Sequence, residues 1–514
     1  ALQLGMIDAI APVDPVEAAR DWLRAHPGKT PLRLRRVAPF DPAEAEAIRE
    51  RALRRARHRP AAVQAADLVM RAAQAPFTEA LAEERAQFQS IRMTPEASAL
   101  RHVFFAERAA ARAPRSTQIP QIGTVAVIGG GTMGAGIAHA MLRAGLTLRL
   151  IERDSPACKA AEARLSALRE ADQTRSRIPP EEAAAMASRL SLHSDMSAVA
   201  GADLVLEAVF EDLEVKRALM ADIAPHLGPQ TIVASNTSYL DLEKMADALP
   251  DPDRFLGLHF FSPAHVMKLL EIVQATRSAP DVLAAGFALA KRLGKQPVLA
   301  RNGFGFIGNR IYAAYRRHAE YALQDGASVQ QIDAAMRGFG MAMGPFEVAD
   351  LSGLDIAWQM RRARGRTPGQ RYVDIPDRLC EAGRFGRKTK AGYYAYADGA
   401  ARPDPAAEAM IAASRAEAGI IPAPLSDEQI QTRLLGAIVT EALRVLDDGI
   451  ASRAGDIDVT LIHGYGFPRW TGGPLHLAAT LTAQERDGML GAVARAEGAA
   501  PDDRLLRLLQ DTAA

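Results

Sequence analysis

The sequence of 514 residues predicts an α/β domain that is preceded by a mainly helical segment and followed by two tandem, duplicated all-α domains. Three observations lead to this prediction. Apolar residues recur at helical spacing up to about residue 118, short β-branched runs alternate with helical stretches between Ile122 and Val298, and helical patterns alone continue to the C-terminus. Strands that alternate with helices are typical of a parallel sheet with helices on both faces.

Composition and charge exclude several classes of partner. Lys plus Arg (62) nearly balance Asp plus Glu (61), and the net charge of +1 provides no field that would attract nucleic acid or a membrane surface. No apolar run reaches the roughly 18 residues that span a bilayer. Cys158 and Cys380 are too few for a disulfide framework, and no CxxC pair or other metal site is predicted. Because few cysteines fit a reducing compartment and the C-terminal DTAA is not a peroxisomal address, we expect a cytoplasmic protein.

The first two domains follow from these patterns. Residues 1–118 contain the helical stretches AAVQAADLVMRAAQ and ALRHVFFAERAAAR, and their Glu and Asp residues fit solvated helix faces. Residues 119–301 form the α/β domain, whose predicted strands are TVAVIG, LTLRLIE, ADLVLEAV, TIVASN, FLGLHFF and LLEIV.

The helical part contains an internal repeat. The stretch EYALQDGASVQQIDAAMRGFGMAMGP at 320–345 returns as EALRVLDDGIASRAGDIDVTLIHGYG at 441–466, so that Asp333 matches Asp458 and Gly340 matches Gly466. A duplicated helical domain explains this repeat, because two related units can bury their apolar faces against each other. We therefore expect one copy at residues 302–403 and the other at residues 404–514.

A glycine-rich loop lies between the first predicted strand and the first helix of the α/β domain. Gly129, Gly131 and Gly134 give a G-x-G-x-x-G motif, in which glycine lets backbone N–H groups approach a pyrophosphate at a helix N-terminus. Glu152 follows 18 residues after Gly134, at the end of the next strand, where a carboxylate would bind ribose hydroxyls. The context predicts a Rossmann-type domain that prefers NAD to NADP, although Arg153 beside Glu152 leaves NADP open. Turn glycines and a solvated glutamate are the alternative interpretation.

Two further pairs of residues are candidates for chemistry. His259 ends a predicted strand and Glu271 lies 12 residues later, as a general base and the carboxylate that orients it would require. A histidine flanked by two phenylalanines is otherwise often a core residue. Ser238 in SNTS and Asn309 in GFIGNR could hydrogen-bond a substrate oxygen or act as ordinary turn and cap residues, and spacing cannot separate these interpretations.

Six motifs together resemble the L-3-hydroxyacyl-CoA dehydrogenases, and most closely the type 1 multifunctional enzymes of fatty acid β-oxidation. These motifs are the glycine loop, EAVFED, SNTS, HFFSPAHVMKLLEIV, GFGFIGNR and GRKTKAGYYAY, in the order of the family. The resemblance implies that His259 is the catalytic base with Glu271 as its partner, and that Ser238 and Asn309 contact the substrate. It implies that NAD is surrounded by Gly129, Gly131, Met133, Gly134, Glu152, Glu211, Lys216 and Lys388. Many relatives carry Asn where this chain has Ser262, which weakens Ser262 alone as a cofactor contact.

The N-terminal segment carries a second resemblance. ALQLGMIDAI is similar to the tail of an enoyl-CoA hydratase domain, and RHVFFAERAA is similar to the helix that joins hydratase to dehydrogenase in those enzymes. The hydratase carboxylates of the family would lie upstream of such a tail. We therefore expect a truncated chain that oxidises (S)-3-hydroxyacyl-CoA to 3-oxoacyl-CoA with NAD and has no hydratase activity.

Two other functions stay open from the sequence. One is a Rossmann oxidoreductase that acts on a small or polar 3-hydroxy acid, and the other is a non-catalytic module that binds acyl-CoA or NAD. Joint retention of His259, Glu271, Ser238 and Asn309 argues against the second. We expect an acyl-CoA substrate and no nucleic-acid partner, and a monomer fits the sequence as well as an oligomer does.

Overall fold

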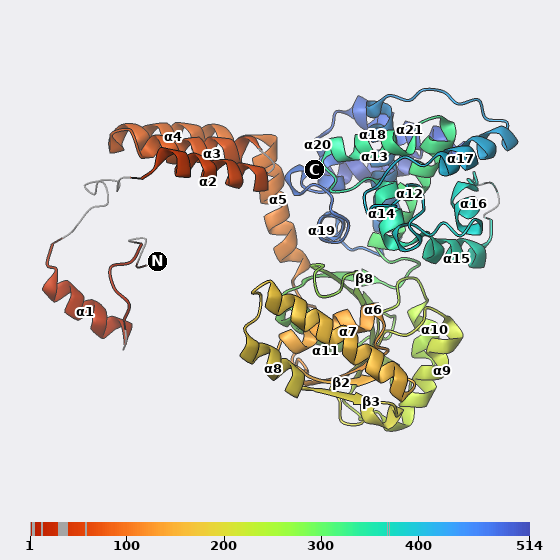
Figure 1. Cartoon of the computed structure of the whole chain (residues 1–514), viewed down its shortest axis with the longest axis horizontal. Coiled ribbons are helices and arrows are strands. Elements are labelled where there is room, and N and C mark those ends of the chain that lie inside the picture. Colours follow the sequence, from red (N-terminus) through yellow and green to blue (C-terminus); the bar gives the residue numbers. More distant parts are fainter. Residues whose placement is uncertain are drawn as a thin grey trace. The chain divides into compact units, whose positions relative to one another are not determined.

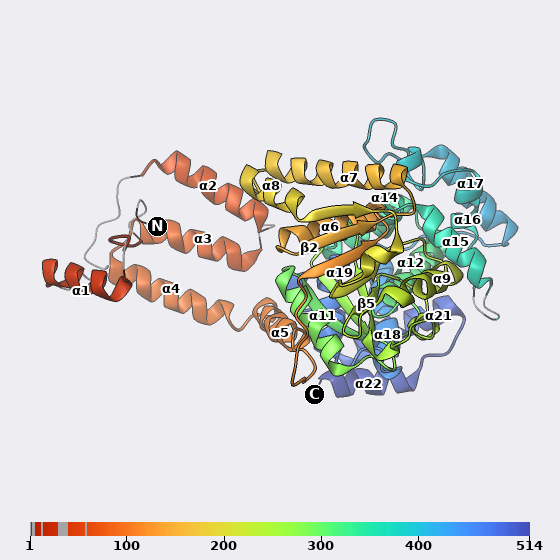
Figure 2. The same ribbon diagram turned by 90° about the horizontal axis from the view of Figure 1, so that it is seen from below.

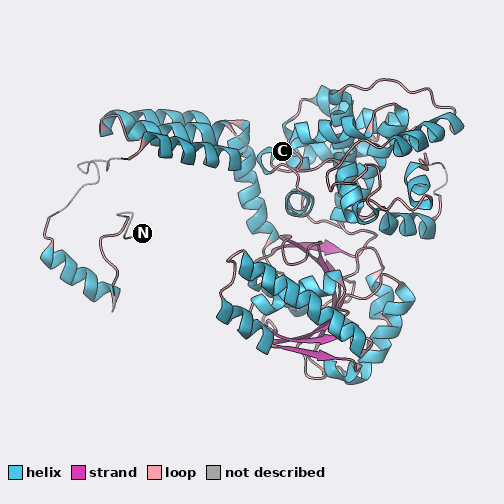
Figure 3. Ribbon diagram, viewed as in Figure 1, coloured by secondary structure: helices cyan, strands magenta, loops and turns pink. Residues whose placement is uncertain are grey.

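The computed structural model describes residues 2, 6–11, 14–28, 40–56, 59–366, 369 and 371–513. These residues belong to two compact units, one of residues 1–94 and the other of residues 95–514. Every strand that the structure describes lies in the second unit (Figure 3). No helix among the described residues is long and apolar enough to cross a membrane.

The first unit is helical, as its sequence predicts. Helices α2, α3 and α4 lie side by side (Figures 1 and 2). Asp14 and Asp41 cap the first two helices, because the Asp14 carboxylate accepts two hydrogen bonds from backbone N–H groups of the first turn and the Asp41 carboxylate accepts one. Part of the hydratase-like stretch, residues 1 and 3–5, lies outside the described residues. The helices are α1 (Pro15–Ala25), α2 (Pro42–Arg55), α3 (Pro60–Ala72) and α4 (Phe77–Ile91).

An eight-stranded sheet forms the centre of the α/β domain, with the strand order β3-β2-β1-β4-β5-β6-β7-β8. Its strands are β1 (Thr124–Ile128), β2 (Thr147–Ile151), β3 (Leu190–His193), β4 (Leu204–Glu207), β5 (Ile232–Ser235), β6 (Phe255–Phe260), β7 (Leu269–Gln274) and β8 (Gln296–Arg301). The sheet is mainly parallel, as predicted, but β7 runs antiparallel to β6. The physical reason is that residues 261–268, which join these strands, contain no helix and are too short for a crossover connection.

The sheet is covered on both faces. Val125 and Val127 point into one core with α6 (Thr132–Arg143), α7 (Ser155–Thr174), α8 (Pro180–Ser188) and α11 (Pro280–Arg292). Ala126 and Ile128, which alternate with them, point into the other core with α9 (Leu213–Ile223) and α10 (Leu242–Ala246). This alternation explains why the central strands are apolar at almost every position.

Of the remaining helices of this unit, α5 precedes the sheet in the chain and the others follow it, and the core on the α9 side continues into them. Helix α5 (Pro95–Ala110) packs on α19 and β8, and α12 packs along α18. The helices are α12 (Gly308–Asp325), α13 (Val329–Phe339), α14 (Pro345–Ser352), α15 (Leu354–Arg364), α16 (Ile375–Glu381), α17 (Pro405–Glu417), α18 (Asp427–Asp447), α19 (Ala454–Tyr465), α20 (Pro474–Thr480), α21 (Ala483–Glu497) and α22 (Asp503–Ala513). Short 3-10 turns include η5 (Arg387–Thr389) and η6 (Arg469–Thr471).

Candidate functional site

Polar residues gather at one edge of the sheet, where the parallel strands have their carboxyl ends. The glycine loop follows β1, Glu207 is the last residue of β4, Ser235 is the last residue of β5, and His259 is the last residue but one of β6. In open α/β sheets ligands bind beyond this edge. The described chain thus brings the predicted cofactor loop and the predicted base to the same edge.

The glycine loop has the shape that a dinucleotide needs. Gly129 has a φ of +94°, and a Cβ there would lie 2.8 Å from the Ala208 carbonyl oxygen. A Cβ on Gly134 would lie 1.8 Å from the Gly129 oxygen, so the first helical turn of α6 can approach the loop only without a side chain. Gly131 begins α6 as its N-cap and has open space around it, and Met133 follows in the first turn. A helix N-terminus without a side-chain cap leaves N–H groups available for phosphate oxygens.

Glu152 lies directly after β2 and turns toward this loop. Its Oε1 atom accepts a hydrogen bond from the Gly130 backbone N–H at 2.7 Å. The carboxylate therefore stands beside the loop, at the position that would meet the ribose of a bound dinucleotide. Arg153 points elsewhere, because its side chain is 85% exposed and pairs with Asp154.

His259 and Glu271 form a buried pair. The register of β6 and β7 sets the two residues directly opposite each other, and Nδ1 of His259 lies 2.7 Å from Oε2 of Glu271. The other carboxylate oxygen accepts the Gly308 backbone N–H, at 2.9 Å, where α12 begins. The Phe261 ring packs against the imidazole with ring centroids 4.4 Å apart. Nε2 of His259 has no hydrogen-bond partner in the described chain, so it is the nitrogen that remains for a substrate.

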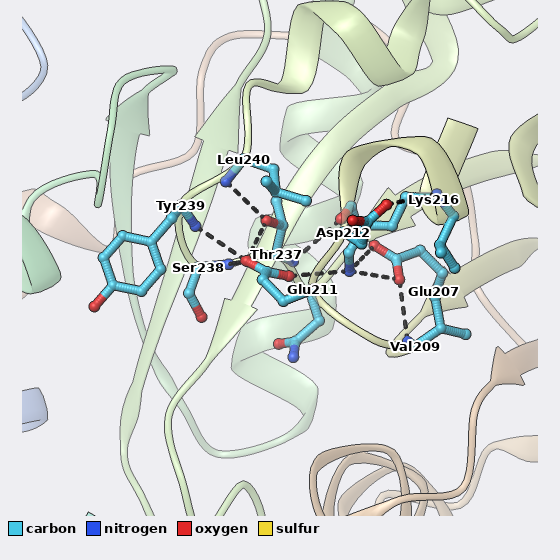
Figure 4. Close-up of polar contacts among 12 residues, drawn as sticks. Glu207, Val209, Glu211, Asp212, Lys216, Thr237, Ser238, Tyr239 and Leu240 are labelled. Carbon is cyan, nitrogen blue, oxygen red and sulfur yellow. Dashed lines mark hydrogen bonds and ion pairs between the residues drawn. The ribbon is translucent and has the colours of Figure 1, made fainter. Parts of the chain in front are cut away.

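Glu211 binds the segment that carries Ser238. Figure 4 shows its carboxylate between this segment and Lys216. One oxygen accepts hydrogen bonds from the Thr237 hydroxyl at 2.7 Å, the Ser238 N–H at 2.7 Å and the Tyr239 N–H at 3.2 Å. The other oxygen lies 3.2 Å from the Lys216 ammonium. The Ser238 hydroxyl itself has no partner among the described residues and is available to a ligand.

Lys216 lies in a buried ionic cluster that the sequence did not reveal. Its ammonium contacts both oxygens of Glu207, at 2.7 and 2.8 Å, and both side chains are 1% exposed. The Ser235 hydroxyl also donates to Glu207. Asn236 completes the arrangement, since its side-chain oxygen accepts the Phe260 N–H at 2.9 Å and ties the loop after β5 to the strand of His259. A glutamate inside the apolar run ADLVLEAV was the available signal for Glu207.

Asn309 is the second residue of α12, one position after the glycine that binds Glu271. Its Oδ1 atom accepts a hydrogen bond from the Tyr465 hydroxyl at 2.6 Å. Tyr465 is the last residue of α19, and nothing in the sequence pointed to it. Asn309 thus follows directly after the residue whose N–H binds Glu271.

Lys388 is the one predicted cofactor residue that stands apart. It lies in η5, where its ammonium is 2.5 Å from Asp355, and no described contact joins it to the glycine loop or to Glu211. No group of three or more His, Cys, Asp or Glu side chains in the described ranges could hold a metal ion.

Comparisons with known proteins agree on one family. A family model described as "3-hydroxyacyl-CoA dehydrogenase, NAD binding domain" matches residues 124–303, and one described as "3-hydroxyacyl-CoA dehydrogenase, C-terminal domain" matches residues 305–396. A "Peroxisomal bifunctional enzyme" of Danio rerio is 35% identical over 508 residues, which are 93% of this chain and 70% of that protein. A "Peroxisomal fatty acid beta-oxidation multifunctional protein" of Oryza sativa subsp. japonica is 34% identical over 78% of this chain and 57% of its own.

A solved structure gives the same result. The crystal structure of the dehydrogenase part of multifunctional enzyme 1 from C. elegans has a TM-score of 0.58 and 26% identity. The match covers 80% of this chain and 96% of that one.

The expected cytoplasmic location is wrong. The relatives from Danio rerio and Oryza sativa are both named peroxisomal. The expectation rested on the low cysteine content and on the ending DTAA, and a low cysteine content does not distinguish one compartment with little disulfide chemistry from another. Import into such a compartment depends on a short receptor-read address, which leaves no trace in bulk composition.

Proposed function

This chain belongs to the 3-hydroxyacyl-CoA dehydrogenase family, and we propose that His259 is the general base with which it oxidises the 3-hydroxyl group of an acyl-CoA thioester. The family fixes the reaction and its cofactor, NAD. The observation that supports the role of His259 is its geometry. Glu271 holds one ring nitrogen at 2.7 Å, and the other nitrogen is left without a partner in the described chain, at the edge of the sheet where substrate binds.

The proton moves from the substrate hydroxyl to Nε2 of His259. At the same time the C3–H bond breaks with its electron pair, and the C3–O bond becomes a carbonyl. When bound, NAD supplies the nicotinamide ring that accepts this hydride. The imidazolium that forms keeps its Nδ1–H directed at Glu271, whose negative charge stabilises it. The Gly308 N–H on the second carboxylate oxygen keeps Glu271 in place.

Ser238 and Asn309 stabilise the substrate oxygen as charge develops on it. The unpartnered hydroxyl of Ser238 and the free carboxamide nitrogen of Asn309 are both donors, as a developing alkoxide requires. Glu211 positions Ser238 through backbone hydrogen bonds, so its effect on the reaction is on the geometry of this donor.

The contacts support some of the proposed cofactor residues more strongly than others. The glycine loop, Met133 and Glu152 form the cradle for the pyrophosphate and ribose, and the absence of space for a Cβ at Gly129 and Gly134 supports this assignment. Glu211, which binds the Ser238 N–H, and Lys216, which pairs with Glu211, would lie at the nicotinamide end. Lys388 keeps its assignment only from the family resemblance, since its contact is with Asp355.

The helical region is, in our proposal, a duplicated pair of domains at residues 302–403 and 404–514. Equivalent contacts support this division. Asp333 in α13 accepts the backbone N–H groups of Phe346 and Glu347 at the start of α14. Asp458 in α19 likewise accepts the N–H groups of Leu475 and His476 at the start of α20. Each of these helices also begins in the same way, with a glycine as N-cap and a proline as first residue. The boundaries of residues 1–118 and 119–301, and the expected lack of hydratase activity, stay predictions.

The proposed role of His259 can be tested with His259→Gln and Glu271→Gln. We expect His259→Gln to lower kcat by about 10²- to 10⁴-fold in both directions, because a positioned base contributes that much. Glu271→Gln should lower kcat and leave the Kd of NADH unchanged, because the lost charge acts on the transition state. The assays are 3-hydroxybutyryl-CoA oxidation and acetoacetyl-CoA reduction against pH. Oxidation needs neutral imidazole and reduction needs imidazolium. In the wild type, kcat for oxidation should therefore rise with pH, whereas kcat for reduction should fall.

A matched control is His139→Gln. His139 is also buried and also pairs with a carboxylate, Asp172, at 2.9 Å, but it belongs to α6 and its partner to α7. This variant should lose stability in thermal unfolding and keep its turnover. Near-normal turnover in His259→Gln would mean that another residue is the base.

A further inference from the structure

Tyr465 joins the second helical domain to the proposed active site. We infer that Tyr465 is a positioning residue, which fixes the carboxamide of Asn309 so that its nitrogen faces the substrate, and that residues 404–514 thereby complete the site. The inference rests on the proposed role of Asn309. It concerns a residue outside the stretch, residues 305–396, that the C-terminal family model matches.

The hydrogen bond that carries the inference is short and partly buried. The Tyr465 hydroxyl donates to Oδ1 of Asn309 at 2.6 Å. Burial raises the pKa of Tyr465 well above its usual value, so the hydroxyl keeps its proton and remains a donor throughout the working pH range. Because Oδ1 is occupied, the side of the carboxamide left for a ligand is the NH₂ group, which has no partner in the described chain. Asn309 is thus prepared to donate to an oxygen that becomes negative.

Two glycines let α19 approach the site closely enough for this bond. A Cβ on Gly308 would lie 2.4 Å from Cε2 of Tyr465, so the ring can rest on the start of α12 only because this residue has no side chain. A Cβ on Gly464 would lie 2.6 Å from Leu269, the first residue of β7. The helix is therefore seated against both elements that hold Glu271.

The ring of Tyr465 also adjoins the environment of the base. It meets Phe261 edge to face with ring centroids 5.6 Å apart, and Phe261 in turn packs on His259. A tyrosine that only filled space here would need its ring and not its hydroxyl. The hydroxyl is what separates positioning from packing, and it can be removed alone.

The test is Tyr465→Phe, which keeps the ring and removes the hydrogen bond. Without it the carboxamide can turn its oxygen toward the substrate, where it would repel the developing charge. We expect kcat for 3-hydroxybutyryl-CoA oxidation to fall about tenfold, as for a lost hydrogen bond of ordinary strength, with an unchanged Kd for NADH. In an Asn309→Ala background the same substitution should have no further effect, because the group that Tyr465 positions is gone.

Tyr315→Phe is the matched control. Tyr315 lies in α12, is 3% exposed, and has a buried hydroxyl without a hydrogen-bond partner among the described residues. It should keep wild-type kcat. Wild-type kcat in Tyr465→Phe beside an impaired Asn309→Ala would overturn the inference and leave the proposed function standing. Losses that multiply in the double variant, or a lower Tm with unchanged kcat, would overturn it too. Full activity in Asn309→Ala would instead refute the proposed role of Asn309, and the inference with it.

Discussion

Glu152, a proposed cofactor contact, also has a hydrogen-bond partner within the structure. Its carboxylate holds the Gly130 N–H at 2.7 Å, so it shapes the loop that it was expected to assist. The proposed ribose contact depends on the same carboxylate, which would accept hydrogen bonds from ribose hydroxyls and repel a 2′-phosphate. A single substitution at this position should therefore affect both the choice of cofactor and the affinity for it.

We expect Glu152→Ala to narrow the preference for NAD over NADP and to raise the KM for NAD. The measurement is the ratio of kcat/KM for the two cofactors in the wild type and the variant. Arg153→Ala serves as a control, because that side chain is exposed and should leave kcat/KM with NAD unchanged. An unaltered ratio in Glu152→Ala would remove Glu152 from the ribose site.

The sequence motifs identified the candidate site residues better than they identified the residues that position them. His259 and Glu271 were candidates because their chemistry suits a base and its partner, and the register of two strands sets them face to face. Glu207 and Asn236 were missed, because their contacts arise only when β4, β5 and β6 lie next to one another. Tyr465 was missed for the same reason on a longer scale, since 156 residues separate it from Asn309.

Helix α5 is held to α19 and η6 by a small ionic cluster. Glu107 lies 2.6 Å from Nε2 of His463 and 2.9 Å from Nη2 of Arg469. Burial alone would raise the pKa of Glu107, but the hydrogen bonds from His463 and Arg469 outweigh it and lower the pKa to about 2. A carboxyl whose pKa is lowered by folding stabilises the folded state at any pH above the pKa that the carboxyl has in the unfolded chain. This stabilisation is lost as the pH falls toward 2.

Glu107→Gln should accordingly lower the free energy of unfolding at pH 7. We expect a loss of about 2 kcal/mol, because hydrogen bonds to charged groups contribute about that much. Thermal unfolding at pH 7 and near pH 3 would check this, and the deficit should shrink at the lower pH. Glu162→Gln is a suitable comparison, because Glu162 is exposed on α7 and has no partner in the described ranges. A deficit of equal size at both pH values would mean that the charge of Glu107 is not what holds α5.

At the scale of elements, the sequence predicted those with strong periodicity. The first strand, the helix after the glycine loop and the long C-terminal helices agree with the structure. The two strands that were missed lie at the sheet edges. Strand β3 has four residues and is partly exposed, whereas β8 contains Pro297, which weakens any strand pattern. The reversal of β7 was also missed, because the apolar pattern of a strand is the same in either direction.

The whole molecule combines carboxyl groups that respond to pH in opposite ways. Burial raises the pKa of Asp333 to about 7, and it raises the pKa of Asp350, Asp456 and Asp458 above their usual value as well. The hydrogen bond from His318 and nearby arginines lower the pKa of Glu497 to about 2. The carboxyl groups with a raised pKa stabilise the fold at a pH below 3.8, the pKa of the unfolded state. They lose that contribution as the pH rises through their pKa in the folded state. The carboxyl groups with a lowered pKa, Glu107 and Glu497, lose their stabilising contribution as the pH falls below 4.5.

These opposite trends predict maximal thermal stability at mildly acidic pH, about 5 to 6. Tm measured from pH 3 to pH 8 should therefore decline on both sides. Asp333→Asn cannot ionise and should flatten the decline of Tm on the alkaline side of this maximum, up to about pH 7, relative to the wild type. A Tm that keeps rising from pH 6 to pH 8 would contradict the prediction.

The antiparallel pairing of β6 and β7 also limits how this chain can change over evolutionary time. Side chains alternate between the faces of a strand, so an insertion or deletion that slid β7 by one residue would send Glu271 to the opposite face from His259. The slipped strand would still read as apolar and could still pair. A change in the length of the connection at 261–268 would thus abolish turnover before it prevented folding, and selection would act on the lost activity. This short loop should therefore tolerate substitutions far better than insertions or deletions.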